Sequence, residues 1–380
     1  MNKLFDLFAV VAPGFESISF KELKSLGFNP IREEAGGITI RGNLETIYRI
    51  NLFSRTINRL LVRLGKFHAS AFSELRKKAG RLSWEDFLNP GQTVSIRAKC
   101  YRSKLYHSKA VVERVSGAIC DRLGEINQSQ IPLDSNGSNT NQLIIVDISN
   151  DECLISVDTS GEALHRRGYR LQTAKAPLRE NLAAAIIMSS GWDLKKPLLD
   201  PLCGSGTIPI EAALMSRNIP PGLNRQFGFM KWRKFNRSAW NQIVESIPTE
   251  NINRRPIIQG SDRDKGAIDI SIHNSIRAGV EDYIEFKNCS MSAISPPKES
   301  GYLISNPPYG KRVSSNKDIR NLYAQLGNVV KLHCKKWQIG ILSSNPLLFS
   351  QLGFEIKKTI HFSNGGINVW LGRGTVPGDR

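Results

Sequence analysis

The residues best suited to chemistry form the short run Ser-Asn-Pro-Pro-Tyr-Gly, residues 305–310, directly after an apolar stretch. Proline has no N–H, so Pro307 and Pro308 remove two backbone donors and leave the Pro307 carbonyl free to accept. The Asn306 side-chain carbonyl is a second acceptor, and Tyr309 offers a flat face for stacking. Two acceptors beside an aromatic plane suit an exocyclic amino group on a planar base. They would hold its nitrogen lone pair toward an electrophile and stabilise the positive charge that develops there. We predict that Asn306, Pro307, Pro308 and Tyr309 are catalytic.

A glycine-rich motif, Asp-Pro-Leu-Cys-Gly-Ser-Gly-Thr over residues 200–207, follows an apolar strand end and precedes a helical apolar pattern. Gly204 and Gly206 allow a sharp turn and a close approach of the backbone to a ligand. In open α/β sheets the crevice at the carboxyl end of such a strand binds nucleotide-like cofactors. Asp262 ends the next buried strand, where a carboxylate can bind a ribose hydroxyl pair. Its separation from Gly206 exceeds the usual spacing of about 20 residues because a basic segment lies between them.

The chain is strongly basic, with 52 Lys and Arg against 34 Asp and Glu, a net charge of +18 and a pI of about 9.8. For a folded enzyme this balance favours a polyanionic partner, nucleic acid above all. The N-terminal apolar run is too short and too charged for a membrane span or a secretory signal. Six scattered cysteines without a CxxC pair indicate a reducing, cytoplasmic location and predict no metal site.

The sequence predicts two kinds of structural unit that position these motifs, namely small α+β units and a unit with a parallel sheet. Residues 4–52 predict a small α+β unit, and residues 56–158 a second one with alternating strands and helices. After residue 177 the pattern is that of a parallel sheet whose successive strands end at Asp200, Asp262 and Asn306. Near residues 173–177 the composition resembles a linker, and we place a domain boundary there.

Two basic regions predict contacts with RNA. In the first, cations at a strand-to-helix joint surround Tyr101 and Tyr106, and the alternative is a solvated face with two packed tyrosines. The second, residues 216–237, interleaves cations with aromatics, which suits stacking on unpaired bases. The alternative for this segment is an insertion packed on its own domain with Phe227, Phe229 and Trp232 buried. His165 favours a structural role, and the arginines that follow it predict a bridge between domains or a grip on phosphate. The predicted RNA-binding residues are Arg97, Lys99, Arg102, Lys104, Lys109, Arg166, Arg167, Arg225, Lys231 and Arg233.

The motifs DPLCGSGTIPIEAA and SNPPYG together resemble those of the class I S-adenosylmethionine-dependent methyltransferases that modify base amino groups. The stretches APLRENLAAA, LHRRGYR and IPPGLNR and the opening α+β unit resemble the THUMP-domain RNA guanine-N2 methyltransferases, in particular the N-terminal half of the bacterial 23S ribosomal RNA enzymes of the methyltransferase L type. The resemblance spans nearly the whole chain.

This resemblance implies an α/β fold with a Rossmann-like class I methyltransferase domain, preceded by α+β ferredoxin-like and THUMP domains. The expected ranges are 1–55 for the ferredoxin-like segment, 56–158 for the THUMP domain, 159–177 for a linker and 178–380 for the methyltransferase domain. The implied cofactor is S-adenosylmethionine, bound by Asp200, Cys203, Gly204, Ser205, Gly206, Asp262, Ser290 and Asn181. Relatives carry an Asp near the adenine where this chain has Ser290, which puts cofactor affinity in question.

The resemblance therefore implies transfer of a methyl group to guanosine N2 in structured RNA, 23S ribosomal RNA or transfer RNA, with no membrane partner. Methylation of adenine N6 is open as an alternative, since the same acceptors suit that amine. A non-catalytic RNA-binding or assembly factor is the other alternative, motivated by Ser290.

Overall fold

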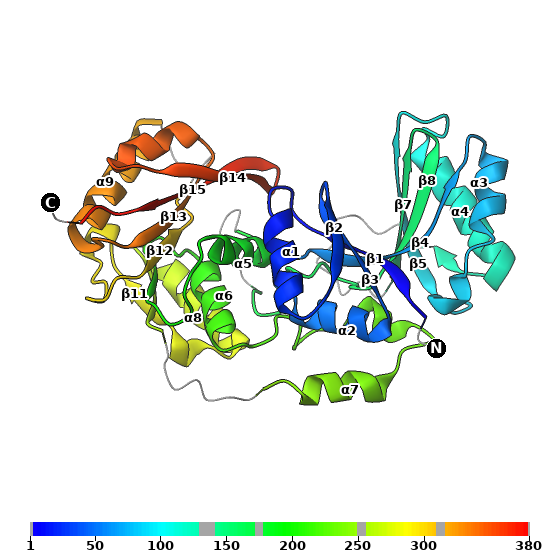
Figure 1. Cartoon of the computed structure of the whole chain (residues 1–380), viewed down its shortest axis with the longest axis horizontal. Helices are drawn as coiled ribbons and strands as arrows, with labels where there is room; N and C mark the ends of the chain where they lie inside the picture. Colours follow the sequence, from blue (N-terminus) through cyan, green and yellow to red (C-terminus); the bar gives the residue numbers. More distant parts are fainter. Residues whose placement is uncertain (1–2, 129–140, 172–177, 249–255, 309–315, 379–380) are drawn as a thin grey trace. The chain divides into compact units, whose positions relative to one another are not determined.

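The computed structural model describes residues 3–128, 141–171, 178–248, 256–308 and 316–378 (Figure 1). Its internal contacts divide the chain into two compact units. Unit 1 comprises Met1–Val10, Leu23–Leu164 and Arg225–Ile247, and unit 2 comprises Val11–Glu22, His165–Asn224 and Pro248–Arg380. Each unit therefore takes one segment from the part of the chain that otherwise builds the other.

An eight-stranded sheet in the order β2-β3-β1-β4-β8-β7-β5-β6 forms the framework of unit 1. Its pairings are antiparallel except that β5 runs parallel to both β6 and β7. The strands are β1 (Phe5–Val10), β2 (Pro30–Glu34), β3 (Gly37–Gly42), β4 (Arg59–His68), β5 (Thr93–Tyr101), β6 (Asn127–Gln128), β7 (Gln142–Ser149) and β8 (Glu152–Asp158).

The helices of this part of the chain follow the predicted apolar spacing. Helix α2 begins in a capping box, in which the Asn43 side chain accepts from the Thr46 N–H and the Thr46 hydroxyl accepts from the Asn43 N–H. Helices α3 and α4 lie side by side next to the strands β4, β5, β7 and β8 (Figure 1). The bounds are α1 (Glu16–Ser25), α2 (Leu44–Phe53), α3 (Phe72–Ala79), η1 (Trp84–Asp86) and α4 (Ser108–Leu123).

The aromatic residues of the basic segment 216–237 belong to the core of unit 1. Phe229 is fully buried and stacks on Tyr48, with 4.7 Å between ring centroids. Trp232 is also buried, and its Nε1 donates to Gln142 Oε1 at 2.9 Å. The prediction that these rings stack on unpaired bases is therefore wrong. The short helix η2 (Gly228–Lys231) and α7 (Arg237–Glu245) carry this packing.

Unit 2 is built on a seven-stranded sheet in the order β11-β10-β9-β12-β13-β15-β14. Five neighbouring strands are parallel, β15 is antiparallel to β13, and β14 is antiparallel to β15. The strands are β9 (Leu198–Asp200), β10 (Ile258–Asp262), β11 (Glu285–Asn288), β12 (Tyr302–Ser305), β13 (Gln338–Ser343), β14 (Lys357–Asn364) and β15 (Ile367–Thr375). This order confirms the predicted Rossmann-like sheet. Strands β10 and β11 follow on one side of β9, and β12 and the later strands lie on its other side, so the strand order reverses between β9 and β12.

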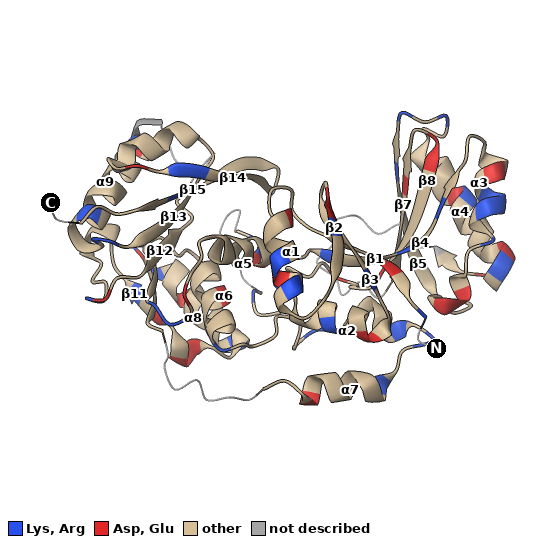
Figure 2. Ribbon diagram, viewed as in Figure 1, with Lys and Arg blue, Asp and Glu red and all other residues tan. Residues whose placement is uncertain are grey.

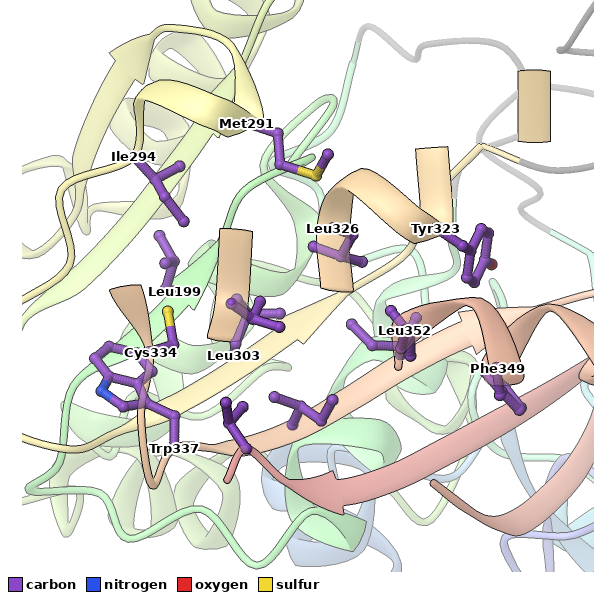
Figure 3. Packing of buried hydrophobic residues seen from close by; sticks show 14 of the residues in the cluster. Leu199, Met291, Ile294, Leu303, Tyr323, Leu326, Cys334, Trp337, Phe349 and Leu352 are labelled. Carbon is purple, nitrogen blue, oxygen red and sulfur yellow. The ribbon is translucent and has the colours of Figure 1, made fainter. Parts of the chain in front are cut away.

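A buried hydrophobic cluster fixes the position of helix α9 on this sheet. Leu303 and Ile339 from the strands pack with Leu326 and Tyr323 from α9, and with Trp337 after it (Figure 3). Helix α6 lies next to α5 and α8 (Figure 1), and α6 also contacts β9 and β10, while α8 contacts β10. The helices are α5 (Glu180–Ser189), α6 (Thr207–Ser216), α8 (Lys265–Ala278), η3 (Glu281–Tyr283), η4 (Met291–Ala293), α9 (Asn316–His333) and η6 (Pro346–Leu352).

The segment expected as a linker, residues 159–177, is packed over its described part. Thr159 and Ser160 are buried in unit 1, where the Ser160 hydroxyl donates to Asn51 Oδ1 at 2.8 Å. Residues 165–171 belong to unit 2, and residues 172–177 lie outside the described residues. None of the described helices is long and apolar enough to cross a membrane.

Candidate active site

The sheet order brings the two sequence motifs together, because β9 and β12 are neighbours and end at the same edge. The Ser305 hydroxyl, at the end of β12, donates to Asp200 Oδ1, at the end of β9, over 2.6 Å. A cavity of about 1010 Å³ opens at this edge. It is lined by residues of both motifs, including Gly204 and Asn306, and by Asp262.

The glycine loop has the left-handed backbone that its sequence predicts. Gly204 has φ +54° and Gly206 has φ +79°, a region that other residues enter only with strain. A Cβ at Gly204 would meet no described atom within 4 Å, whereas one at Gly206 would lie 3.0 Å from Ser271 Cβ. The Gly204 N–H donates to Asp262 Oδ2 at 3.0 Å. The carboxylate at the end of β10 thus holds the glycine loop that follows β9.

Asp200 is buried beneath this loop. Burial raises the pKa of its carboxyl to about 7, with a further increase from the charge of Asp262 and an opposing effect of the bonds from Ser305 and the Leu202 N–H. Burial also raises the pKa of the Cys203 thiol well above its usual value. The thiol is consequently protonated at neutral pH and is no thiolate nucleophile.

Asn306 has an acceptor without a donor. Its Oδ1 is buried and receives no hydrogen bond from any residue that the structure describes, while the side chain lines the cavity. A buried carbonyl oxygen of this kind normally has a partner, so an N–H group of a ligand would complete the site. Pro308 also lines the cavity, Pro307 is buried, and Tyr309 lies outside the described residues.

Most of the expected cofactor residues line this cavity, namely Asp200, Cys203, Gly204, Ser205, Asp262 and Ser290. Ser290 lies at the start of η4, and its hydroxyl is 2.9 Å from that of Ser292. Gly206 is the last residue of the loop before α6, and Asn181 is buried in the first turn of α5. Neither residue belongs to the described cavity wall, so the prediction that Asn181 binds the cofactor gains no support.

The first basic cluster is exposed in unit 1. Arg102, Lys104 and Lys109 are exposed, and Tyr101 and Tyr106 are 54% and 69% exposed. The alternative of two packed tyrosines is therefore wrong. Figure 2 shows that the neighbouring helices α3 and α4 carry acidic as well as basic residues, whereas Tyr101–Lys109 contains no acid. Arg97 is half-buried and Lys99 is exposed on β5.

The other predicted RNA-binding residues have mixed surroundings. Arg167 is buried in unit 2, 3.6 Å from Glu211, which contradicts the prediction that it contacts RNA. Arg225 donates to the carbonyls of Glu162 and Ala163 in unit 1 and has a structural role there. Lys231 and Arg233 are exposed, and Arg166 is half-buried.

The sequence reasoning missed one wall of the cavity, the polar face of α9. Asp318, Asn321, Gln325 and Asn328 all line the cavity. Their spacing of three or four residues places them on one helical face. A run of amides at that spacing directly after the SNPPYG motif was the signal that could have revealed this wall. Among the described residues, no group of His, Cys, Asp and Glu side chains is arranged to hold a metal ion.

Comparison with protein families agrees with this site. The family model described as RMKL-like, methyltransferase domain, matches residues 167–371, which is more than half of the chain. The chain belongs to the RMKL-like methyltransferase family. Two further models match the preceding part, the RlmL ferredoxin-like domain at residues 6–61 and the THUMP domain at residues 69–158. The resemblance and the fold class predicted from the motifs are thus confirmed.

Known proteins similar to this RMKL-like methyltransferase include a Syntrophotalea carbinolica protein named ribosomal RNA large subunit methyltransferase K/L. It is 34% identical over 98% of this chain and 53% of its own length, so the chain spans about half of that relative. The crystal structure of SMU.472 complexed with SAH is 33% identical, covers all of both chains and has a TM-score of 0.88. A Listeria monocytogenes protein described as a predicted N6-adenine-specific DNA methylase is 32% identical, with a TM-score of 0.86 over 97% of this chain and 96% of its own.

Proposed function

We propose that this protein transfers a methyl group from S-adenosylmethionine to the exocyclic N2 of a guanosine in structured RNA, 23S ribosomal RNA in the cytoplasm. One observation carries the proposal: Asn306, whose buried Oδ1 accepts no hydrogen bond from the described residues, lines the same cavity as the glycine loop. The site therefore combines an acceptor for an amino group with a cradle for a nucleotide-like methyl donor.

The residues around the glycine loop fit S-adenosylmethionine. Gly204 leaves open space where any side chain would begin, and Asp262 presents a carboxylate to the cavity for the ribose hydroxyls. The similar crystal structure of SMU.472 contains SAH, the demethylated form of this cofactor, which supports the same ligand here. When bound, the cofactor supplies an electrophilic methyl group.

Asn306 and the Pro307 carbonyl would orient the nucleophile. Each can accept one N–H of the base amino group, which directs the nitrogen lone pair out of the ring plane and stabilises the charge that grows on nitrogen. Orientation of this kind can supply roughly 7–11 kcal/mol of the barrier. The proton released from the nitrogen can pass to water after the transfer, so the site needs no strong general base.

The RNA substrate is favoured by the net charge, by the THUMP match and by the exposed cluster around Tyr101 and Tyr106. Arg102, Lys104 and Lys109 would neutralise phosphates, and the two tyrosines could stack on bases. The target base must leave its stack to reach Asn306, at a cost of a few kcal/mol that is smallest for an unpaired base. The 23S molecule and position N2 rest on the names of the ribosomal RNA relatives.

The variant Asn306→Ala tests the catalytic assignment. Loss of one acceptor that acts on the developing charge should lower methyl transfer at least about a hundredfold. The affinity for SAH, measured by calorimetry, should stay within about threefold, because the glycine loop and Asp262 are unchanged. Gln325→Ala, which alters another wall of the same cavity, serves as the control for cavity shape. Near-normal turnover in Asn306→Ala would contradict the proposal.

Nucleoside mass spectrometry identifies the base and the RNA. We expect 23S ribosomal RNA from cells lacking this protein to lack one N2-methylguanosine and to regain it on incubation with the protein and S-adenosylmethionine. Loss of N2-methylguanosine from transfer RNA, or loss of N6-methyladenosine, would reassign the substrate. Unchanged RNA together with undetectable binding of S-adenosylmethionine at millimolar concentration would favour a non-catalytic RNA-binding factor.

A further inference from the structure

The segment His165–Arg170 of unit 2 contains two buried residues, Arg167 and Tyr169, whose contacts the proposed chemistry does not use. We call it the junction segment, because Leu164 directly before it is the last residue of a segment of unit 1. The Tyr169 hydroxyl donates to Glu211 Oε1 on α6 at 3.1 Å, and Arg167 lies 3.6 Å from the same carboxylate. None of its residues belongs to the described wall of the cavity.

One chain of hydrogen bonds leads from the junction segment to the glycine loop through α8. The Tyr169 carbonyl accepts from Arg277 Nε at 2.7 Å, and Arg277 Nη2 donates to Asn274 Oδ1 at 2.6 Å. Asn274 is fully buried, and its Nδ2 donates to the Ser205 carbonyl at 3.0 Å. The two ends of one amide group thus connect the segment to the middle of the loop.

A second route runs through Arg170. Its Nη1 donates to the Leu178 carbonyl at 2.7 Å and to the Thr207 hydroxyl at 3.3 Å, while Nη2 donates to Glu180 Oε2 at 3.0 Å. Leu178 and Thr207 both line the cavity. A planar guanidinium can make these contacts at once because its donors point in fixed directions.

Both routes end on the short stretch between Gly204 and Thr207. This stretch contains two glycines in the left-handed region, so its own backbone preferences hold it weakly. Hydrogen bonds to the Ser205 carbonyl and the Thr207 hydroxyl would hold the backbone in place where the cofactor binds. Binding to a loop that is already ordered loses less conformational entropy than binding to one that must be ordered.

We infer that Arg170 and Asn274 are positioning residues that preorganise the glycine loop for S-adenosylmethionine. The inference rests on the proposed function in one respect, namely that this loop binds the cofactor.

The test compares two substitutions of residues outside the described cavity wall, Asn274→Ala and Arg170→Met, in the full-length protein. Each has a matched control in unit 1. Asn51 is a buried asparagine that bonds to Ile47, Thr159 and Ser160, and Arg59 is a guanidinium that bridges Asp158 and the Gly161 carbonyl. The controls are therefore Asn51→Ala and Arg59→Met, which remove comparable buried hydrogen bonds away from the loop.

Isothermal titration calorimetry with SAH supplies the readout, because it separates affinity from the fraction of folded protein. Each test substitution should weaken SAH binding at least about tenfold, the effect of roughly one buried hydrogen bond, with unchanged stoichiometry. A merely structural defect would lower the stoichiometry and leave the dissociation constant of the folded fraction unchanged, and this is expected of the controls. In methylation assays the KM for S-adenosylmethionine should rise, while kcat should stay within about threefold of the wild-type value. The KM of Arg170→Lys, which keeps one charged donor, should lie between those of wild type and Arg170→Met.

Wild-type affinity in both test variants would overturn the inference and leave the proposed function intact. Equal weakening in the matched controls would also overturn it, because the effect would then reflect general destabilisation. If the wild-type protein itself bound no SAH, the proposed function would fail at its cofactor step.

Discussion

The variant Asp200→Asn should be less stable than the wild-type protein at acid pH and more stable than it at alkaline pH. The carboxyl is buried, and its pKa is raised from 3.8 to about 7 in the folded protein. Between these values the unfolded chain releases the proton while the folded protein retains it, so the stability of the wild-type protein falls as the pH rises. Above pH 7 the fall ends, because both states are then ionised.

The magnitude follows from the size of this shift. Roughly three pKa units correspond to about 4 kcal/mol, lost by the wild-type protein between pH 4 and pH 8. An Asn side chain keeps the oxygen that accepts from Ser305 and Leu202. It carries no charge, so the variant does not lose this stability as the pH rises. Its extra N–H groups cost about 2 kcal/mol at every pH if they find no acceptor. Asp200→Asn should therefore be less stable than wild type by about 2 kcal/mol at pH 4 and more stable by about 2 kcal/mol at pH 8.

Thermal unfolding of the ligand-free proteins checks this prediction. For a unit of this size, 4 kcal/mol corresponds to a change of about 8–16 °C in the difference between the two melting temperatures. All other titrating groups are common to both proteins, so their effects cancel in the difference. A constant offset between Asp200→Asn and wild type from pH 4 to pH 8 would refute the reasoning.

Two further predictions concern the buried parts of each unit. Burial, followed by the charges of Arg179 and Arg167, lowers the pKa of His165 from 6.5 to about 3, so its contribution to stability is present above pH 6.5 and is lost as the pH falls. Wild type should lose about 2 kcal/mol relative to His165→Gln between pH 7 and pH 5, measured on the unfolding transition that SAH shifts, and no relative loss would show that the imidazole is solvated. Phe229→Ala should destabilise unit 1 by about 3–5 kcal/mol in urea unfolding, whereas Arg233→Ala on the same segment should change it by less than about 0.5 kcal/mol. Equal effects of these two substitutions would contradict the burial of the ring.

The sequence was sufficient for most of the helices and strands and for the two motifs that meet at the cavity. Short apolar runs identified the strands that end at Asp200 and Asp262, because strands covered on both faces of a parallel sheet tend to be rich in apolar residues; β9 contains Leu198 and Leu199, and β10 begins with Ile258. The position of Asn306 after an apolar stretch then placed it at the same edge as the glycine loop. Both motifs are local, since each needs only its own turn and the strand before it, so residue types and spacing determine them.

Other parts of the site depend on which surfaces pack together, and no local pattern determines that. The segment 216–237 reads as an RNA-binding stretch because cations alternate with aromatics, but Phe229 and Trp232 are buried against Tyr48 and Phe87 from distant parts of the chain. Arg167 reads as a phosphate ligand until the fold places Glu211 beside it. A buried arginine and an exposed one have the same local sequence signal. Only the residue that packs against the side chain in the folded protein, such as Glu211 beside Arg167, distinguishes them.

The amino-acid sequence by itself thus indicated the family through its resemblance to known motifs, and it indicated the sheet and the two motifs of the candidate site because these follow from spacing along one chain. Only the tertiary structure decided which of the predicted cations are exposed, which polar face of α9 completes the cavity, and which side chains hydrogen-bond to the glycine loop. The reason is physical. The bonds from Asn274 to Ser205 and from Arg170 to Thr207 join residues that are far apart in sequence, and their geometry exists only once the helices have packed.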